Sequence, residues 1–493
     1  MKKIFFIAFI FFVSIAISQN ESEFSIYESQ EYIDEVKTDS ILSIYTSNQG
    51  NTAVVRVNKK NFYYDIYSND FKRTYTNSEK IERKERFIGD VFYNDEIKIF
   101  TESYPDKELK TVWCQTLDLK SNTLKKIQLT TAAVDKRFSL YSNTKGAKFA
   151  ISPNQKYLSI ISFTVNRDKI FFHISVFNAT TLAIIYEKLI TRNESKFYGI
   201  SDFHIDNDLN LYLLGSSYYN EDSPTSKNGA DQYHLLEKIS ETNHEKLDIS
   251  FEDKYISKLK ASMVNGKYNL YGIYSDKELG RIKGTFTVSV NLKTLDFKNE
   301  IFQELPSQIY IDLYGDEKRK KKELSDFKIN YILSDSENNI YFLAEEFYMS
   351  SGSTGFTGSI GGAGGSSSTP HYDDIIILKF TKEGDVSWGR SIYKRAGESN
   401  YNAFIKDDEL HILLNTGKDL KKLKDGRTKT SKGFFETTAL YDYNYSIEGK
   451  LTISKIQNNK NKTYYIPKFG SYVNGKFIMI SKSHNSRRFM KLN

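Results

Sequence analysis

Cysteine is almost absent from this sequence, since Cys114 is the only one in 493 residues. A single thiol excludes an intramolecular disulfide framework, and a chain of this length can bury an ample core without one. Cys114 stands in a strand-like run, residues 112–117. Free cysteine usually behaves as a small buried hydrophobe, so we expect a structural thiol here and not a nucleophile.

Long apolar runs are also lacking, with one exception at the N-terminus. Residues 4–13 are apolar, Lys2 and Lys3 precede them, and the small residues Ala16 and Ser18 follow. This layout predicts a secretory signal peptide at residues 1–18, cleaved before Gln19; the alternative is an uncleaved anchor. The run is too short to span a bilayer, and we expect no membrane span elsewhere. The sequence therefore predicts an exported protein, periplasmic or extracellular.

A strong charge of one sign is missing as well. The formal net charge is +7, and loss of Lys2 and Lys3 with the signal peptide lowers it to +5. The densest basic runs, residues 318–322 and 418–432, contain or adjoin acidic residues and read as solvated loops or sheet edges. No nucleic-acid-binding motif is present, so we expect no nucleic acid as partner.

Familiar catalytic signatures are absent too. The sequence has no His-Glu-x-x-His, Cys-x-x-Cys or Gly-x-Ser-x-Gly motif, and its Gly-rich segment lacks the pattern of a phosphate-binding loop. Residues 206–210 begin like a calcium loop, but Leu211 replaces the required glycine and Ser217 the bidentate acid. We read this segment as a hairpin turn, predict no cofactor and assign no catalytic residue.

Aromatic residues, by contrast, are abundant. The chain has 35 Tyr and 34 Phe but only 6 Pro, and apolar stripes with helical spacing are hard to find after residue 18. Aromatic and β-branched side chains suit the half-buried surface of a sheet. The composition predicts an all-β fold.

Short alternating runs recur along the chain about every 50 to 70 residues, the spacing of four-stranded propeller blades. The last run is followed only by a short segment, residues 487–492. We therefore predict a single β-propeller in which the first and last runs share one blade, giving seven blades within a range of six to eight. Two smaller all-β domains are the alternative, but no Pro- or Gly-rich linker divides the repeats. The runs are residues 41–45, 96–100, 157–161, 211–215, 268–272, 340–344, 410–414 and 477–480.

Two segments carry a resemblance to known propellers. Residues 373–380, a turn at 382–385 and residues 386–392 form an acidic start, an aliphatic strand, a Gly turn and a Trp strand. This stretch resembles the outer half of a blade in bacterial β-propeller repeat proteins. Residues 151–158 resemble the Ser-Pro-Asp-Gly-Lys turn of tricorn-like and WD-repeat propellers, with Asn154 and Gln155 in place of Asp and Gly. The resemblance implies a fold and no particular activity.

A Gly/Ser-rich segment, residues 350–369, interrupts one repeat. Because it lies between two strands of the same predicted blade, we expect a flexible loop within the domain of residues 19–493 and not a linker between domains.

Acidic and aromatic residues flank this segment on both sides, and we expect neighbouring strands to bring them together at one rim of the propeller. Carboxylates there could ligate a cation or act as acid and base, while the aromatic rings could stack on a sugar or peptide. Mutual repulsion of the carboxylates would be relieved by a cation, a basic ligand or hydration. In the simpler interpretation, the acids only keep the rim soluble. The candidate binding residues are Glu345, Glu346, Tyr348, Tyr372, Asp373, Asp374 and Trp388.

Three functional hypotheses follow. The one we favour is a non-enzymatic propeller that binds a protein or glycan at the cell envelope. The second is a propeller hydrolase or lyase that acts on polysaccharide or peptide with its rim carboxylates. The third is a scaffold or sensor-like module of an envelope complex.

Overall fold

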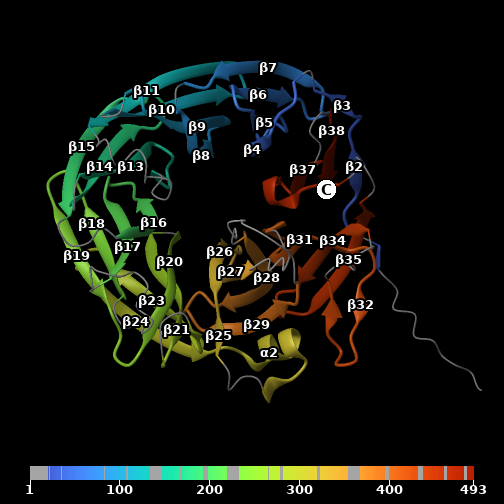
Figure 1. Cartoon of the computed structure of the whole chain (residues 1–493). Helices are drawn as coiled ribbons and strands as arrows, with labels where there is room; N and C mark the ends of the chain where they lie inside the picture. The colour runs from blue at the N-terminus through green and yellow to red at the C-terminus, as the bar shows by residue number, and fades with distance from the viewer. Residues whose placement is uncertain are drawn as a thin grey trace, which may run out of the picture.

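A computed structural model shows a ring of blades around a central axis (Figure 1). It describes residues 20–493 except residues 22, 35, 83, 107–108, 134–146, 167–168, 193–197, 219–231, 265, 278–280, 319–322, 353–366, 395–398, 431–436, 460–463 and 482–485. The predicted signal peptide, residues 1–18, lies outside the described residues.

Each blade is a four-stranded antiparallel sheet whose first strand is innermost. The strands of blades 1 and 2 are β4 (Ser40–Thr46), β5 (Thr52–Val57), β6 (Asn61–Tyr67) and β7 (Arg73–Lys80), then β8 (Arg86–Tyr93), β9 (Glu96–Ser103), β10 (Leu109–Asp118) and β11 (Thr123–Ala133). Those of blades 3 and 4 are β12 (Lys148–Ile151), β13 (Tyr157–Asn166), β14 (Lys169–Asn178) and β15 (Ile184–Arg192), then β16 (Gly199–Ile205), β17 (Leu211–Tyr218), β18 (Gln232–Ile239) and β19 (His244–Ile249).

The second half of the ring follows the same plan. The strands of blades 5 and 6 are β20 (Tyr255–Val264), β21 (Lys267–Ser275), β23 (Gly284–Asn291) and β24 (Asp296–Glu304), then β26 (Phe327–Ser334), β27 (Ile340–Gly352), β28 (Ser367–Phe380) and β29 (Val386–Ile392). Those of blades 7 and 8 are β30 (Tyr401–Lys406), β31 (Glu409–Gly417), β34 (Thr438–Tyr445) and β35 (Leu451–Asn458), then β36 (Ser471–Val473), β37 (Lys476–Ile480), β39 (Phe489–Leu492) and β2 (Ile26–Glu28).

The all-β single propeller is confirmed, but the predicted seven blades are wrong: there are eight. The last blade has only three C-terminal strands, and its outermost strand is β2, which precedes the first sequence run. The run at residues 41–45 belongs to β4 and opens a complete blade of its own. Closure by N- and C-terminal strands in one blade is therefore confirmed, with a different N-terminal strand from the one we expected.

Short elements lie at the edges of the blades and in the connections between their strands. Strand β1 (Asn20–Glu21) runs parallel to β35, so the N-terminal segment crosses from blade 7 to blade 8. The remaining short elements are β3 (Tyr32–Ile33), paired with β38 (Ser486–Arg487); β22 (Arg281–Ile282), paired with β25 (Leu324–Ser325); β32 (Lys421–Lys422), paired with β33 (Thr428–Lys429); the helix α2 (Ser307–Tyr314); and the 3-10 helix η3 (Pro467–Phe469).

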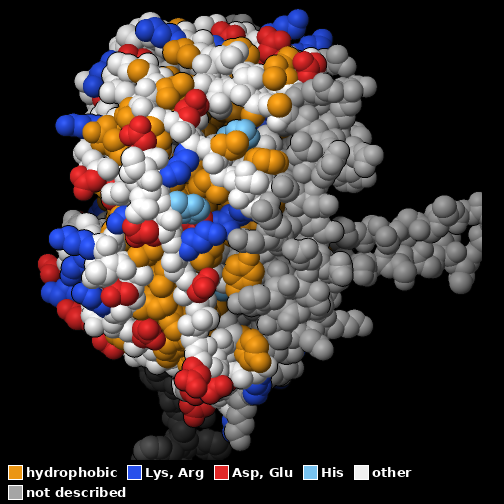
Figure 2. All heavy atoms as spheres, turned by 90° about the vertical axis from the view of Figure 1, so that its left-hand side faces the viewer, with side chains coloured by type: hydrophobic (Ala, Val, Ile, Leu, Met, Phe, Trp, Pro, Cys, Tyr) orange, Lys and Arg blue, Asp and Glu red, His pale blue; other side chains and the backbone are white. Residues whose placement is uncertain are grey.

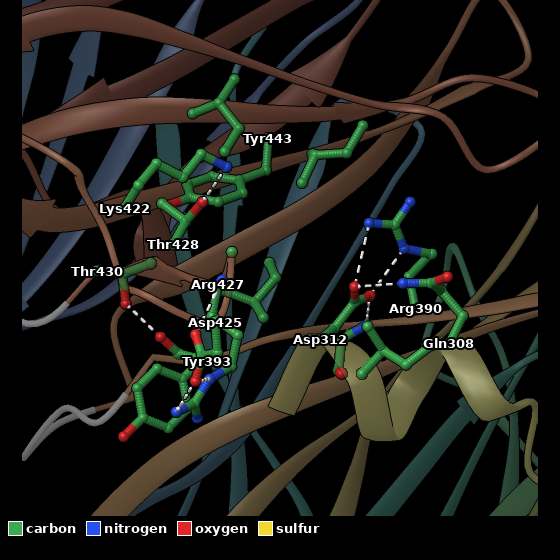
Figure 3. Close-up of a pocket in the computed structure, with 16 residues that line it drawn as sticks. Gln308, Asp312, Arg390, Tyr393, Lys422, Asp425, Arg427, Thr428, Thr430 and Tyr443 are labelled. Carbon is green, nitrogen blue, oxygen red and sulfur yellow. Dashed lines mark hydrogen bonds and ion pairs between the residues drawn. The ribbon is translucent and has the colours of Figure 1, made fainter. Parts of the chain in front are cut away.

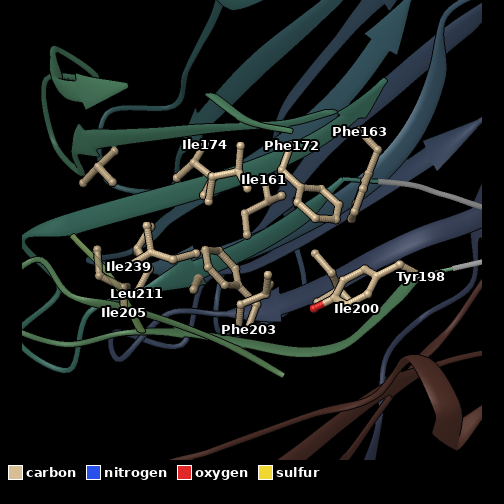
Figure 4. Packing of buried hydrophobic residues seen from close by; sticks show 14 of the residues in the cluster. Ile161, Phe163, Phe172, Ile174, Tyr198, Ile200, Phe203, Ile205, Leu211 and Ile239 are labelled. Carbon is tan, nitrogen blue, oxygen red and sulfur yellow. The ribbon is translucent and has the colours of Figure 1, made fainter. Parts of the chain in front are cut away.

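The core lies between adjacent blades, because both faces of every blade are covered by a neighbour. Between blades 3 and 4, Phe172 is fully buried and its ring lies against Phe163 and Tyr198 (Figure 4). Burying one such ring contributes about 1.5–3 kcal/mol. Cys114 is buried in the next cluster of the ring, as we predicted for a structural thiol.

Polar turns fasten the blades to one another at the lower face, defined here as the face where the first strand of each blade ends and the second begins. The segment that begins like a calcium loop is such a turn: Asp206 Oδ1 accepts from the amides of Asp208 and Asn210. Asp335 builds the same turn in blade 6. Bonds between neighbouring turns join Asn474 to Asn48, Asn48 to Asp95, Asn154 to Asn207 and Ser336 to Asp408.

The outer strands carry a mixed surface. In the flank that Figure 2 shows, basic, acidic and hydrophobic side chains are interspersed. On the edge strand β15, the charged Glu187 and Lys188 lie between the exposed Ile184 and Leu189. Charges on an edge strand discourage pairing with another chain. Among the described residues, no helix has the length and apolar character needed to cross a membrane.

Candidate functional site

Strands β27 and β28 pair as neighbours, as we predicted. The pairing continues through residues 350–352 and 367–369, which we had placed in the flexible loop, and the rest of that predicted loop, residues 353–366, lies outside the described residues. Glu345 lies opposite Ile375, Phe347 lies opposite Tyr372, and a bulge falls between them. This pairing gathers six of the seven candidate residues at the upper face, the face where the second strand of each blade ends. The six residues are Glu345, Glu346, Tyr348, Tyr372, Asp373 and Asp374.

Trp388 does not join them, so its assignment to this group is wrong. It pairs with Lys379 in the antiparallel β28–β29 ladder, far along the strands from Asp373. Its Nε1 donates to the carbonyl oxygen of Ile447 at 2.9 Å, and its ring stacks on Tyr445 with centroids 5.9 Å apart. Trp388 therefore fastens blade 6 to blade 7.

A buried lysine lies among the predicted carboxylates. The Lys394 ammonium donates to Glu345, and the two side chains are 2% and 3% exposed. Asn330 Nδ2 donates to the other Glu345 oxygen at 3.0 Å, and the Lys394 amide donates to Asp374 at 3.0 Å. Of the three ways in which we expected the carboxylate repulsion to be relieved, the chain itself supplies a cation, the Lys394 ammonium.

Burial dominates the electrostatics of this lysine. It lowers the pKa of Lys394 below its ordinary value, and attraction by Glu345, Asp373 and Asp374 offsets only part of that effect. A buried charge is tolerated when a counter-charge and hydrogen bonds replace the lost water. Lys394 and Glu345 meet this condition, so they form a structural ion pair.

This ion pair belongs to a recurring arrangement. Where the chain passes from the last strand of one blade to the first strand of the next, a buried polar residue bonds to a nearby strand. Asp34 binds Arg487, and Glu85 accepts from Thr101 at 2.5 Å. The other described examples are Arg192 with Glu237, Lys394 with Glu345, and Asn459 with Asn415. We call these residues crossover latches.

The aromatic candidates make local contacts. Tyr348 donates to Asp373 Oδ2 at 3.0 Å and stacks on His371, with centroids 4.7 Å apart and ring planes 6° from parallel. The rings of Tyr372 and Phe347 are 4.9 Å apart. These contacts stiffen the extension of the β27–β28 hairpin beyond the body of the blade.

The remaining carboxylates open onto a cavity at the upper face, which we call the acidic pocket. It has a volume of about 270 Å³ and is lined by Glu323, Glu346, Asp374, Arg281, Tyr314 and Phe327, with Leu324 and Ser325. Glu323 Oε2 accepts from Ser275 Oγ at 2.8 Å, so its position is fixed from blade 5. Three carboxylates and one guanidinium give the lining an acidic balance. Sequence reasoning missed Glu323, Arg281 and Tyr314, because they lie outside the hairpin. Arg281 belongs to the connection between β21 and β23 in blade 5, and Tyr314 and Glu323 belong to the crossover from blade 5 to blade 6.

Among the described residues, no group of three or more His, Cys, Asp or Glu side chains has the arrangement of a metal site. Hydrogen-bond acceptors dominate the lining of the acidic pocket instead. Such a lining suits an ammonium or guanidinium group, which carries several donors and a positive charge.

No protein-family model matches this chain, and no curated protein matches its sequence. Solved structures share its architecture. One is the WD40 domain of SCAP from fission yeast, which matches at 7% identity over 95% of this chain and 94% of that chain, with a TM-score of 0.44. Another is the polysaccharide lyase Uly1, which matches at 8% identity over 82% of this chain and 89% of that chain, with a TM-score of 0.41. Prolyl oligopeptidase B from Galerina marginata matches at 9% identity over 91% of this chain and 55% of that chain, with a TM-score of 0.41. The eight blades of the ring show by themselves that the chain is a β-propeller. At these identities and TM-scores, the likenesses carry no argument about activity or ligand.

Proposed function

We propose that this chain is an exported, non-enzymatic β-propeller that binds a protein partner, and that a lysine or arginine side chain of the partner enters the acidic pocket. The observation that carries the proposal is the cavity of about 270 Å³ lined by Glu323, Glu346 and Asp374. Hydrogen bonds in which a charged donor meets a carboxylate are about twice as strong as neutral ones.

Two features support binding over catalysis. The carboxylate with the best-defined geometry, Glu345, serves the fold, because Lys394 and Asn330 hold its two oxygens. The acidic pocket also lies at an open end of the ring, beside the extended β27–β28 hairpin. Concave sites next to projecting loops are common positions for partner recognition.

Calorimetric titration of the full mature chain with capped lysine and arginine dipeptides tests the proposal. The matched probe is the same dipeptide with norleucine, which keeps the apolar stem and lacks the charge. We expect the two basic probes to bind and the norleucine probe not to bind. Glu346→Gln should weaken binding of the basic probes about tenfold, the effect of losing one hydrogen bond to a charged group.

Glu337→Gln is the control, because Glu337 is an exposed carboxylate at the opposite end of β27, in the lower-face turn. It should leave binding of the dipeptides unchanged. Equal binding of the norleucine probe, or equal losses in the two variants, would contradict a specific role for the acidic pocket. Binding of neutral oligosaccharides in preference to basic peptides would favour a glycan ligand instead.

A further inference from the structure

A second cavity lies on the outer side of the ring, between α2, β29 and the β32–β33 hairpin (Figure 3). This outer pocket has a volume of about 280 Å³, near the lower end of the range for small-molecule sites. Ile392, Leu451 and Ile453, together with Ile311 of α2, form its apolar part. It shares no lining residue with the acidic pocket.

Both acids in the outer pocket are neutralised by arginines. Arg390 binds Asp312 through two nitrogens, at 2.7 and 3.3 Å, and Arg427 binds Asp425 at 2.8 Å. Gly315, which ends α2 with φ +74°, brings the helix end against the β32–β33 hairpin, where a side chain in its place would meet Asp425. The charged walls of the pocket are therefore held in place by ion pairs that leave no net charge.

One cation remains. Lys422 lines the outer pocket and donates to the Thr428 hydroxyl at 2.8 Å, and no described carboxylate pairs with it. Residues 418–429, which contain the hairpin, include six basic and two acidic side chains. A local excess of positive charge attracts anions and raises their concentration at the surface.

An unpartnered hydroxyl provides the second observation. Tyr443 lines the same pocket and is 1% exposed, and its hydroxyl has no hydrogen-bond partner in the described part of the chain. Burial raises the pKa of Tyr443 well above its ordinary value, so the hydroxyl keeps its proton and is available as a donor. A buried polar group without a partner in a native fold calls for an explanation, such as a bound molecule.

We propose that the outer pocket binds a small organic carboxylate, which accepts hydrogen bonds from the Tyr443 hydroxyl and the Lys422 ammonium. The apolar part of the ligand packs against Ile392, Leu451 and Ile453. A carboxylate satisfies both donors because it is acceptor-only and offers two oxygens. A ligand amine would add positive charge beside Lys422. A neutral apolar molecule would leave the Tyr443 hydroxyl without an acceptor and the Lys422 ammonium without a counter-charge.

Titration with benzoate, followed by calorimetry or ligand-observed NMR, tests this site in the full mature chain. Benzyl alcohol and benzylamine are the matched probes, since they keep the ring and change the charge. We expect benzoate to bind and the two others to bind at least tenfold more weakly. Tyr443→Phe and Lys422→Gln should each weaken benzoate binding about 10- to 100-fold, the range for a hydrogen bond to a charged group.

Two controls separate the site from its surroundings. Tyr445→Phe removes another unpartnered buried hydroxyl on the same strand that does not line the pocket, and Lys424→Gln removes an exposed charge of the same hairpin. Neither should change benzoate binding.

Tyr443→Phe should unfold at the same temperature as the native chain or higher, because it removes a buried group without a partner. Absence of benzoate binding, equal binding of benzyl alcohol, or no effect of Tyr443→Phe would overturn the proposal. Glu346→Gln should have no effect here, so failure at this pocket and at the acidic pocket can be told apart.

Discussion

Replacing Arg487 by Met tests how the ring is closed. Arg487 is 2% exposed and lies between the second and third strands of blade 8. Its Nε donates to Asp34 Oδ2 at 2.8 Å, a second nitrogen bonds to the other Asp34 oxygen, and a third reaches Asp65 at 3.2 Å. These contacts tie the C-terminal strands to the N-terminal crossover and to blade 1.

The expected loss of stability follows from the arginine contacts that Asp34 and Asp65 retain in the Arg487→Met variant. Asp65 retains Arg56, whose nitrogens lie 2.8 and 2.9 Å from it, whereas Asp34 retains Arg56 only at 3.7 Å. Arg487→Met thus leaves one buried carboxylate almost uncompensated, and breaking a buried pair in this way costs about 3–5 kcal/mol. Domains are typically stable by about 5–15 kcal/mol, so the change should be large.

Urea denaturation followed by far-UV circular dichroism measures this loss. The double variant Asp34→Asn with Arg487→Met should be less destabilised than Arg487→Met alone, because it removes the stranded charge. Arg488→Gln is the control: Arg488 is adjacent in sequence, its pair with Glu31 spans 3.8 Å, and its side chain is 33% exposed. It should cost less than about 1 kcal/mol. The reasoning would be refuted if Arg487→Met lost as little unfolding free energy as Arg488→Gln. It would also be refuted if the double variant were less stable than Arg487→Met alone.

Three further predictions concern pH, the hairpin extension and processing. Burial lowers the pKa of His234 to about 4 from its ordinary 6.5, so between these pH values the unfolded chain binds the proton and the folded chain does not. The free energy of unfolding should therefore fall by about 3 kcal/mol as the pH drops from about 6.5 to about 4. In urea denaturation, the variant His234→Gln should lack this histidine-dependent fall. The β27–β28 pairing already reaches Gly352 and Ser367, so replacing residues 353–366 by a two-residue turn should change the free energy of unfolding by less than about 1 kcal/mol; a collapsed circular dichroism spectrum would contradict this. Intact mass spectrometry of the exported protein should give a chain that starts at Gln19, and retention of residues 1–18 would show that the signal is not cleaved.

The propeller could be predicted because its repeat is carried by local signals. Alternating apolar runs mark the second strand of seven blades, and polar turns such as those at Asp206 and Asp335 precede two of them. The blade number was wrong because the closing strand is short: β2 has three residues, all exposed, and leaves no apolar alternation to recognise. Its pairing with β39 is decided by ring closure, which is a property of the whole chain.

The candidate site shows the same division between local and long-range information. The β27–β28 pairing follows from adjacency in sequence, so six of the predicted residues do meet. Trp388 was misplaced because its position along β29 depends on the ladder register, which sets it opposite Lys379. Counting back from the turn at residues 382–385 is the signal that could have shown this.

The role of Lys394 could not be predicted from the residues around it, although its ion pair makes Glu345 a structural residue. It stands 49 residues after Glu345, just beyond the end of β29. The β28–β29 ladder sets Ile392 opposite Ile375, and this long-range register brings Lys394 to the upper face. The other described latches connect crossovers to strands in the same way, so a buried polar or charged residue fastens five of the crossovers in the described part of the ring. A carboxylate that faces such a latch serves the fold, whereas Glu346, one residue further along β27, lines a cavity. The bulge between Glu345 and Phe347 marks this division, since it separates the residue held by Lys394 from the residue that lines the acidic pocket.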